Sequence, residues 1–125
     1  MFLIISEDKS DAKYQIKAYQ PGLITVNEVK YSKSLIIGAD QLIDSWHPQS
    51  LSEIKSEDWD LVINLKPEII LLGTGKKFLV PKPALLAPIY KANIGFEFMD
   101  TQAACRTYMA LVSEDRKIIA VLLIE

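Results

Sequence analysis

The chain has 125 residues, of which half are hydrophobic and 24% are charged, and this composition excludes extended disorder. A formal charge of −2 and a pI near 5.4 exclude the basic surface that nucleic-acid-binding proteins present, so no nucleic-acid partner is expected. A single cysteine excludes an internal disulfide framework and favours a reducing compartment. We therefore expect a cytoplasmic protein.

The length predicts one domain over residues 1–125, in which residues 1–11 form a loosely attached N-terminal segment. The apolar start at Met1–Ile5 is only about five residues long, and it lacks the basic region and cleavage site of a signal peptide. No stretch approaches the roughly 18–20 apolar residues of a membrane-spanning helix. We therefore expect no membrane span.

Short β structure is predicted for the first third of the chain. Apolar and polar residues alternate from Tyr14 to Ala18, which is the period of a half-buried strand. Pro21-Gly22 is a turn dipeptide, and Asn27-Glu28 separates two further apolar runs like the turn of a hairpin. The strands expected after the first one cover residues 23–26, 29–31 and 35–38.

The last seventy residues alternate between helical and strand patterns. Ser56 precedes the acidic residues Glu57 and Asp58, so a helix capped by this serine is expected to start there and to end before Pro67. Pro83 can occupy the first turn of a later helix. Such alternation indicates an α/β sheet, because parallel strands need helical crossovers. The expected elements are strands 68–72, 96–98 and 118–124 and helices 84–93 and 101–113, the last capped by Asp100 or Thr101.

The predicted strand 68–72 stops at Gly73-Thr74-Gly75-Lys76, where an α/β sheet would place a ligand. The phosphate-loop pattern requires glycine at position 70, where this chain has Ile70. The dinucleotide pattern requires glycine at position 78, where this chain has Phe78. Both nucleotide motifs are therefore excluded. Two readings stay open: a tight turn at the strand exit, or a loop whose amides and Lys76 or Lys77 meet an anion.

Catalytic and metal-binding sets are not evident in the sequence. Cys105 and His47 have the residue types of a nucleophile and its base, but Cys105 falls on the apolar stripe of its predicted helix. One cysteine and one histidine do not make a zinc site. We expect no catalytic residue, metal or cofactor. We interpret the two tryptophans, Trp46 and Trp59, as packing residues. The acidic run is interpreted as a solvated face and consists of Glu53, Glu57, Asp58 and Asp60.

Arg106 lies off the apolar stripe of the same predicted helix, so its side chain is expected to point away from the core. It can pair with an acidic residue such as Asp100, Glu114 or Asp115. Alternatively, its guanidinium reaches an anion held near the helix start, where the helix dipole favours negative charge.

Two motifs carry a resemblance. Leu71-Leu72-Gly73-Thr74-Gly75 is followed about two dozen residues later by Glu97-Phe98-Met99-Asp100-Thr101-Gln102-Ala103-Ala104-Cys105-Arg106-Thr107-Tyr108. Together they resemble the family of small proteins that includes mitochondrial complex I assembly factor 3 and the adipogenesis-associated domain protein. Residues 16–19 and 34–37 also fit, so the resemblance covers residues 12–124 and points to a bacterial member.

The resemblance implies a three-layer α/β fold, in which a central mixed sheet of about five strands has helices on one side and a small β layer on the other. It also implies a function that is not settled, because the mitochondrial relative assists assembly by binding partners and the family offers no catalytic residues. Met109 stands where the family usually has asparagine, so a polar site that needs this amide would be lost here.

Two hypotheses on function follow. The first is a non-enzymatic binding or assembly-factor-like module with a protein partner, existing as a monomer or weak homodimer. The alternative is a small-molecule or anion-binding domain, with or without weak enzymatic activity, that uses a crevice between the Gly73–Gly75 loop and the helix starting near Asp100. The candidate binding residues are Gly73, Thr74, Gly75, Lys76, Asp100, Thr101 and Arg106.

Overall fold

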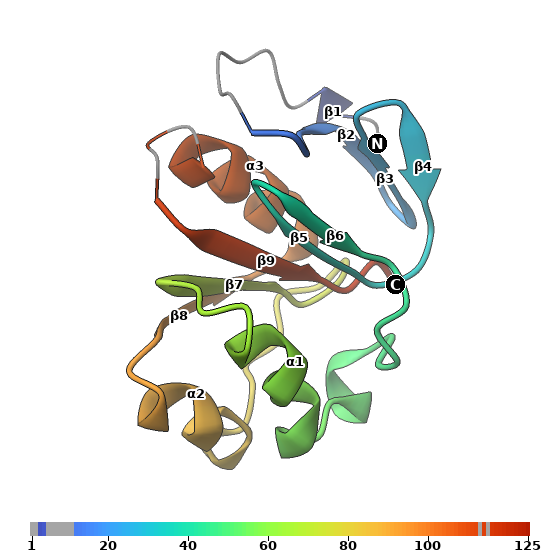
Figure 1. Ribbon diagram of the computed structural model, residues 1–125. Coiled ribbons are helices and arrows are strands. Elements are labelled where there is room, and N and C mark those ends of the chain that lie inside the picture. Colours follow the sequence, from blue (N-terminus) through green and yellow to red (C-terminus); the bar gives the residue numbers. More distant parts are fainter. Residues whose placement is uncertain (1–2, 5–11, 113, 115) are drawn as a thin grey trace.

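The computed structural model describes residues 3–4, 12–112, 114 and 116–125 and contains two sheets (Figure 1). The central sheet has five strands in the order β6-β5-β9-β7-β8. Strand β7 runs parallel to β8 and β9, whereas β5 runs antiparallel to β9 and β6, so the predicted mixed sheet is confirmed. The strands are β5 (Leu35–Gly38), β6 (Gln41–Ile43), β7 (Ile69–Gly73), β8 (Gly95–Met99) and β9 (Ile118–Leu122).

A small antiparallel sheet precedes the central one in the chain. Its strands β2 and β3 are joined at Gly22, which adopts a φ of 83°, and β3 and β4 are joined at Asn27, with a φ of 54°. Both predicted turns are therefore confirmed. The predicted N-terminal segment 1–11 lies outside the described residues except for β1. The four strands are β1 (Leu3–Ile4), β2 (Ile16–Gln20), β3 (Leu23–Val26) and β4 (Val29–Tyr31).

Short helices cover one face of the central sheet, below it in Figure 1. Ser56 does not cap α1 as expected, because the chain first makes a 3-10 turn and the Asp58 carboxylate accepts the Lys55 amide at 2.7 Å. The predicted helix 84–93 divides in two, with Pro88 in the first turn of α2. These elements are η1 (Leu51–Glu53), η2 (Ser56–Asp58), α1 (Trp59–Ile63), η3 (Pro83–Leu86) and α2 (Ala87–Lys91).

The long helix α3 (Thr101–Val112) packs on the other face of the central sheet, together with the small sheet. Strands β7 and β9 are buried on both faces: Leu71 belongs to the core beneath α3, whereas Ile70 and Leu72 belong to the core of the short helices. The predicted fold class is confirmed, and the structure adds that α3 shares its face with the small sheet. Among the described residues, none of the helices has the length and apolar character needed to cross a membrane.

Candidate functional site

The glycine turn lies where the three parallel strands β7, β8 and β9 end together, at the edge of the sheet where α/β proteins bind ligands. A side chain at Gly73 would meet protein atoms at once. Its Cβ would stand 2.8 Å from the Thr101 hydroxyl and 3.1 Å from the Ala104 Cβ. Gly75 has a φ of 108°, and a Cβ there would stand 2.5 Å from the Glu125 carbonyl oxygen. Both glycines are therefore needed for close packing of the chain on itself.

Three consecutive backbone amides of this turn donate within the protein. The Thr74 amide donates to the Met99 carbonyl at 2.8 Å, and the Lys76 amide donates to the Glu125 carbonyl at 3.2 Å. The Gly75 amide, between them, donates to the Thr101 hydroxyl at 2.8 Å. An anion-binding loop offers its amides to the ligand. In this turn the three consecutive amides join the ends of β7, β8 and β9 instead.

Thr101 is the buried centre of this junction. Its hydroxyl accepts the Gly75 amide and donates to the Leu123 carbonyl at 2.5 Å, while its own amide donates to the Gly75 carbonyl at 2.9 Å. Asp100 caps α3, because its carboxylate accepts the Ala103 amide at 2.9 Å. Of the two predicted caps, Asp100 therefore has this role. We call the set Gly73, Thr74, Gly75, Asp100, Thr101 and Leu123–Glu125 the glycine junction.

Two predicted site residues lie outside the glycine junction. The side chain of Lys76 is exposed, and Arg106 is exposed more than one turn further along α3, pointing away from the core as expected. Met109 contacts the small sheet, where its sulfur accepts the Ile16 amide at 3.3 Å. The sequence-predicted site residues thus separate into a hydrogen-bonded group, buried except for the half-buried Asp100, and two solvent-exposed cations.

Cys105 and His47 do not form a pair. Burial, with a smaller contribution from the charge of Asp100, raises the pKa of the Cys105 thiol from 9.0 to about 12. His47 is exposed, and its neighbour Trp46 belongs to the core on the opposite face of the central sheet. A thiol that keeps its proton at neutral pH is a poor nucleophile. The expectation that Cys105 is a buried core residue is confirmed.

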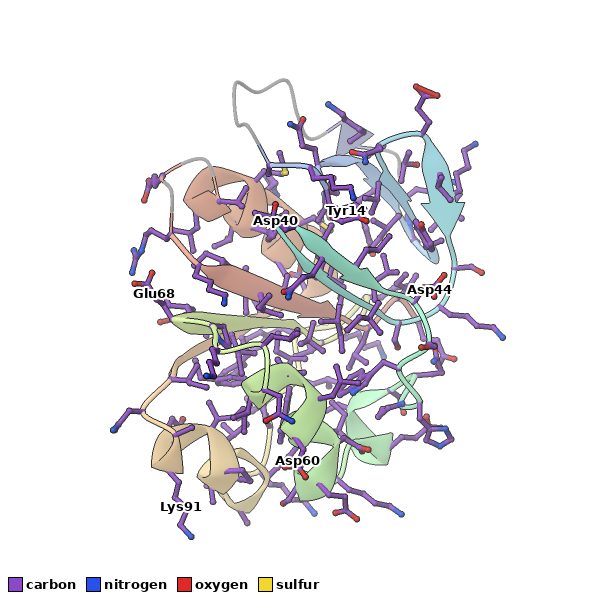
Figure 2. The ribbon with its side chains drawn as sticks, in the orientation of Figure 1. Tyr14, Asp40, Asp44, Asp60, Glu68 and Lys91 are labelled. Carbon is purple, nitrogen blue, oxygen red and sulfur yellow. The ribbon has the colours of Figure 1, made fainter. Side chains whose placement is uncertain are left out.

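Tyr108 is the second buried ionisable group on α3. Its hydroxyl donates to the Tyr14 carbonyl at 3.2 Å, and Figure 2 labels Tyr14 and Asp40 close to this helix. Burial above all, and then the charge of Asp40, raises the pKa of Tyr108. The hydroxyl therefore stays a hydrogen-bond donor to the loop before β2 rather than a proton-transfer group.

The segment that follows the glycine junction has the opposite character. Phe78, Leu79 and Val80 are consecutive apolar residues with exposed fractions of 58%, 43% and 67%. Thr74 holds them in place, since its hydroxyl donates to the Lys77 carbonyl at 2.6 Å and accepts the Leu79 amide at 3.1 Å. These apolar side chains are therefore presented to solvent by a fixed backbone.

A groove of about 610 Å³ adjoins this segment, between it and the turns η1 and η2. The ring of Phe78 stacks on that of Phe98 in β8, with centroids 5.6 Å apart and an angle of 13°. We call residues 76–85 together with this groove the Lys76–Leu85 surface. The groove is lined by Leu51, Ser52, Ile54, Lys55, Ser56, Leu79, Val80, Lys82, Ala84 and Leu85.

Sequence reasoning missed this surface. Phe78-Leu79-Val80 has the composition of a core strand, so nothing in its periodicity marks it as exposed. Two signals were available: lysines and prolines flank the apolar triplet, and no acidic residue occurs between Glu68 and Glu97.

Residues 16–123, which include the central sheet, strands β2 to β4 and most of the glycine junction, match the family model described as "Protein of unknown function (DUF498/DUF598)". The chain belongs to the DUF498/DUF598 family. The predicted resemblance is confirmed, because proteins named "NADH dehydrogenase [ubiquinone] 1 alpha subcomplex assembly factor 3" are also similar to this chain.

Three proteins illustrate the range of this family's relatives. A "13 kDa major membrane protein" of Francisella tularensis is 33% identical over 97% of this chain and 99% of its own length. The mouse "NADH dehydrogenase [ubiquinone] 1 alpha subcomplex assembly factor 3" is 33% identical over 61% of this chain, which spans only 42% of that relative. A crystal structure of a Bordetella parapertussis protein superposes with a TM-score of 0.85 and 32% identity, over 94% of this chain and 100% of that one.

Proposed function

We propose that the protein is a non-enzymatic binding module of the assembly-factor type, and that it engages its partner through the Lys76–Leu85 surface. One observation carries this proposal: three consecutive apolar side chains, Phe78, Leu79 and Val80, are exposed on a fixed backbone beside an apolar groove. Exposed apolar patches of this kind mark interaction sites in soluble domains. Because the backbone is already held by Thr74, little conformational entropy is lost on binding.

The chemistry of the glycine junction supports a role without catalysis. Its amides and the Thr101 hydroxyl are used in holding three strand ends together, and the thiol of Cys105 is buried with a raised pKa. A binding role needs neither an activated nucleophile nor a free anion cradle. The single, buried cysteine is also consistent with the cytoplasmic location that we propose.

The names of two relatives support our proposal of an assembly role with a partner at a membrane. The assembly-factor name of the mouse relative favours a role in assembly, and the membrane-protein name of the Francisella relative favours a partner at a membrane. The match to the mouse protein covers less than half of its length, so we extend only this general role to the present chain.

Purification from bacterial cells under gentle conditions tests the proposal. The tagged chain is compared with Val80→Asp and with Val29→Asp, a matched control at an apolar residue of β4 that is 52% exposed. We expect one species, protein or lipid, that is retained by the wild type and by Val29→Asp and is lost from Val80→Asp. A species retained equally by all three chains, or no reproducible species, would contradict the proposal.

A further inference from the structure

We infer that the partner of the Lys76–Leu85 surface is an anionic lipid bilayer, against which the chain docks peripherally without crossing it. This inference rests on the proposed function, because it assigns an occupant to the same surface. It is carried by the distribution of charge around the exposed apolar triplet and by the type of cation that supplies this charge.

Positive charge is concentrated around the triplet. Between Glu68 and Glu97 the sequence has four lysines and no acidic residue, whereas the rest of the chain carries the other ten basic residues and all sixteen acidic ones. Lys76, Lys77 and Lys82 flank the triplet in the chain, and all three are exposed. A protein with a net negative charge thus presents a local cationic, apolar surface, which is complementary to anionic headgroups.

In the part of the chain that the structure describes, no acidic side chain forms an ion pair with the lysines of this surface. Next to the groove, the carboxylates of Glu53 and Asp58 accept the amides of Gln49 and Lys55 at 2.8 and 2.7 Å. Glu125 contacts the start of the surface through its carbonyl oxygen, which accepts the Lys76 amide. Lys55 and Lys82, on the lining of the groove, add positive charge on both of its sides.

The residue types favour lipid over a protein partner. Protein interfaces are enriched in arginine and depleted in lysine, especially where apolar side chains become fully buried. Here every cation beside the apolar triplet is a lysine. Lysine can lay its methylene stem along the acyl boundary while its ammonium group stays among the headgroups. Phe78, Leu79 and Val80 would then enter the interface, and the lysines would contact the anionic lipids.

Sedimentation with vesicles tests this inference on the full chain. The probes are vesicles of phosphatidylcholine alone and vesicles with an equal part of phosphatidylglycerol. We expect binding to the anionic vesicles only. Since a lysine near an anionic surface contributes about a fivefold change in affinity, replacing Lys76, Lys77 and Lys82 by glutamine should weaken binding roughly a hundredfold. Val80→Ser should weaken it about fivefold at unchanged charge.

The matched control replaces Lys30, Lys33 and Lys117, which are exposed elsewhere, by glutamine and so removes the same charge. This control variant should bind the anionic vesicles as the wild type does. All variants should have the melting temperature of the wild type. Equal loss in both triple variants, equal binding to neutral vesicles, or no binding to either vesicle would overturn the inference. If vesicles fail but Val80→Asp loses a specific protein in cells, the lipid assignment falls and the proposed function stands. If Val80→Asp also loses nothing in cells, both fall.

Discussion

The glycine junction and the Lys76–Leu85 surface are neighbours in the chain, yet they differ in almost every physical respect. In the junction, Gly73, Thr74 and Thr101 are buried and three consecutive amides are bonded to other segments. Immediately after it, Lys76 to Val80 are all exposed. Thr74 connects the two regions, because its amide bonds to β8 and its hydroxyl holds the exposed turn.

The Gly-Thr-Gly motif of this family therefore supports the segment that we propose as the binding site, and its own residues are used in packing. The Gly-Thr-Gly motif fixes where the chain leaves the sheet, and so it determines how the next segment is presented. We therefore expect changes in the junction to act on stability and changes in the exposed segment to act on binding. The following predictions separate the two effects, from the largest expected change to the smallest.

Gly73→Ala should give the largest loss of stability. The new Cβ would lie 2.8 Å from the Thr101 hydroxyl and 3.0 Å from the Thr101 Cα, which is backbone and cannot move aside. We expect the free energy of unfolding to fall by about 3 kcal/mol in urea titration. Gly95→Ala is the control, because there the new Cβ would meet Ile69 at 3.3 Å and a small shift relieves the contact. Equal losses in both variants would contradict the assignment of Gly73.

Thr101→Val should cost about 2 kcal/mol, because it leaves the Gly75 amide and the Leu123 carbonyl without their buried partner. Thr107→Val is a matched control on the same helix, since among the described residues the Thr107 hydroxyl bonds only to the sulfur of Met99 at 3.3 Å. We expect the control to change stability by less than about 0.5 kcal/mol. A control loss as large as that of Thr101→Val would show that the hydroxyl bridge is unimportant.

The stability of the protein should decrease at alkaline pH. The pKa of Cys105 is raised by burial from 9.0 to about 12, so between these values the folded state keeps a proton that the unfolded state releases. Binding of more protons by the folded state makes the unfolding free energy fall as pH rises through this window. Raised pKa values of Tyr108 and Tyr19, both caused mainly by burial, act in the same direction at higher pH.

Urea titrations at neutral and alkaline pH test this linkage, with Cys105→Ala as the comparison. The variant should lose less stability than the wild type between neutral pH and the ordinary tyrosine pKa of about 10. An identical pH dependence would mean that the thiol ionises normally in the folded chain.

Val80→Asp should change the free energy of unfolding by less than about 0.5 kcal/mol, because the side chain is 67% exposed. The melting temperature should therefore stay close to that of the wild type. The same substitution is expected to abolish partner retention, so this variant separates folding from binding. A large thermal destabilisation would place Val80 in the structural support of the junction.

Anions should have the smallest effect. A thermal-shift screen with phosphate, nucleotides and carboxylates should be flat, because the amides of Thr74, Gly75 and Lys76 already have partners. A ligand at 100-fold excess over its Kd would add about 2.7 kcal/mol and would be readily detected. A shift that is lost in Arg106→Ala would instead support the predicted anion-binding alternative.

Much of the fold could be predicted from the sequence, because its signals are local. Doubly buried strands at β7 and β9, the turn at Gly22 and the cap at Asp100 follow from hydrophobic runs and turn chemistry. The short strand β6 depends on tertiary pairing and was not predicted. The division of the helix 84–93 at Pro88 is a local effect of proline, which fits only the first turn of a helix. The candidate site was harder to predict from the sequence. Contacts between segments far apart in the chain decide whether Gly73 faces a ligand or α3 and whether Phe78 is buried or exposed.

Photo-cross-linking in bacterial cells compares the Lys76–Leu85 surface with the exposed side of α3 as the place where a partner is contacted. A photoreactive phenylalanine analogue is placed at position 80, in the exposed segment, or at position 106, on the exposed side of α3 beyond the junction. We expect a defined protein or lipid adduct from position 80 and only background from position 106. A defined adduct from position 106 with none from position 80 would contradict this expectation.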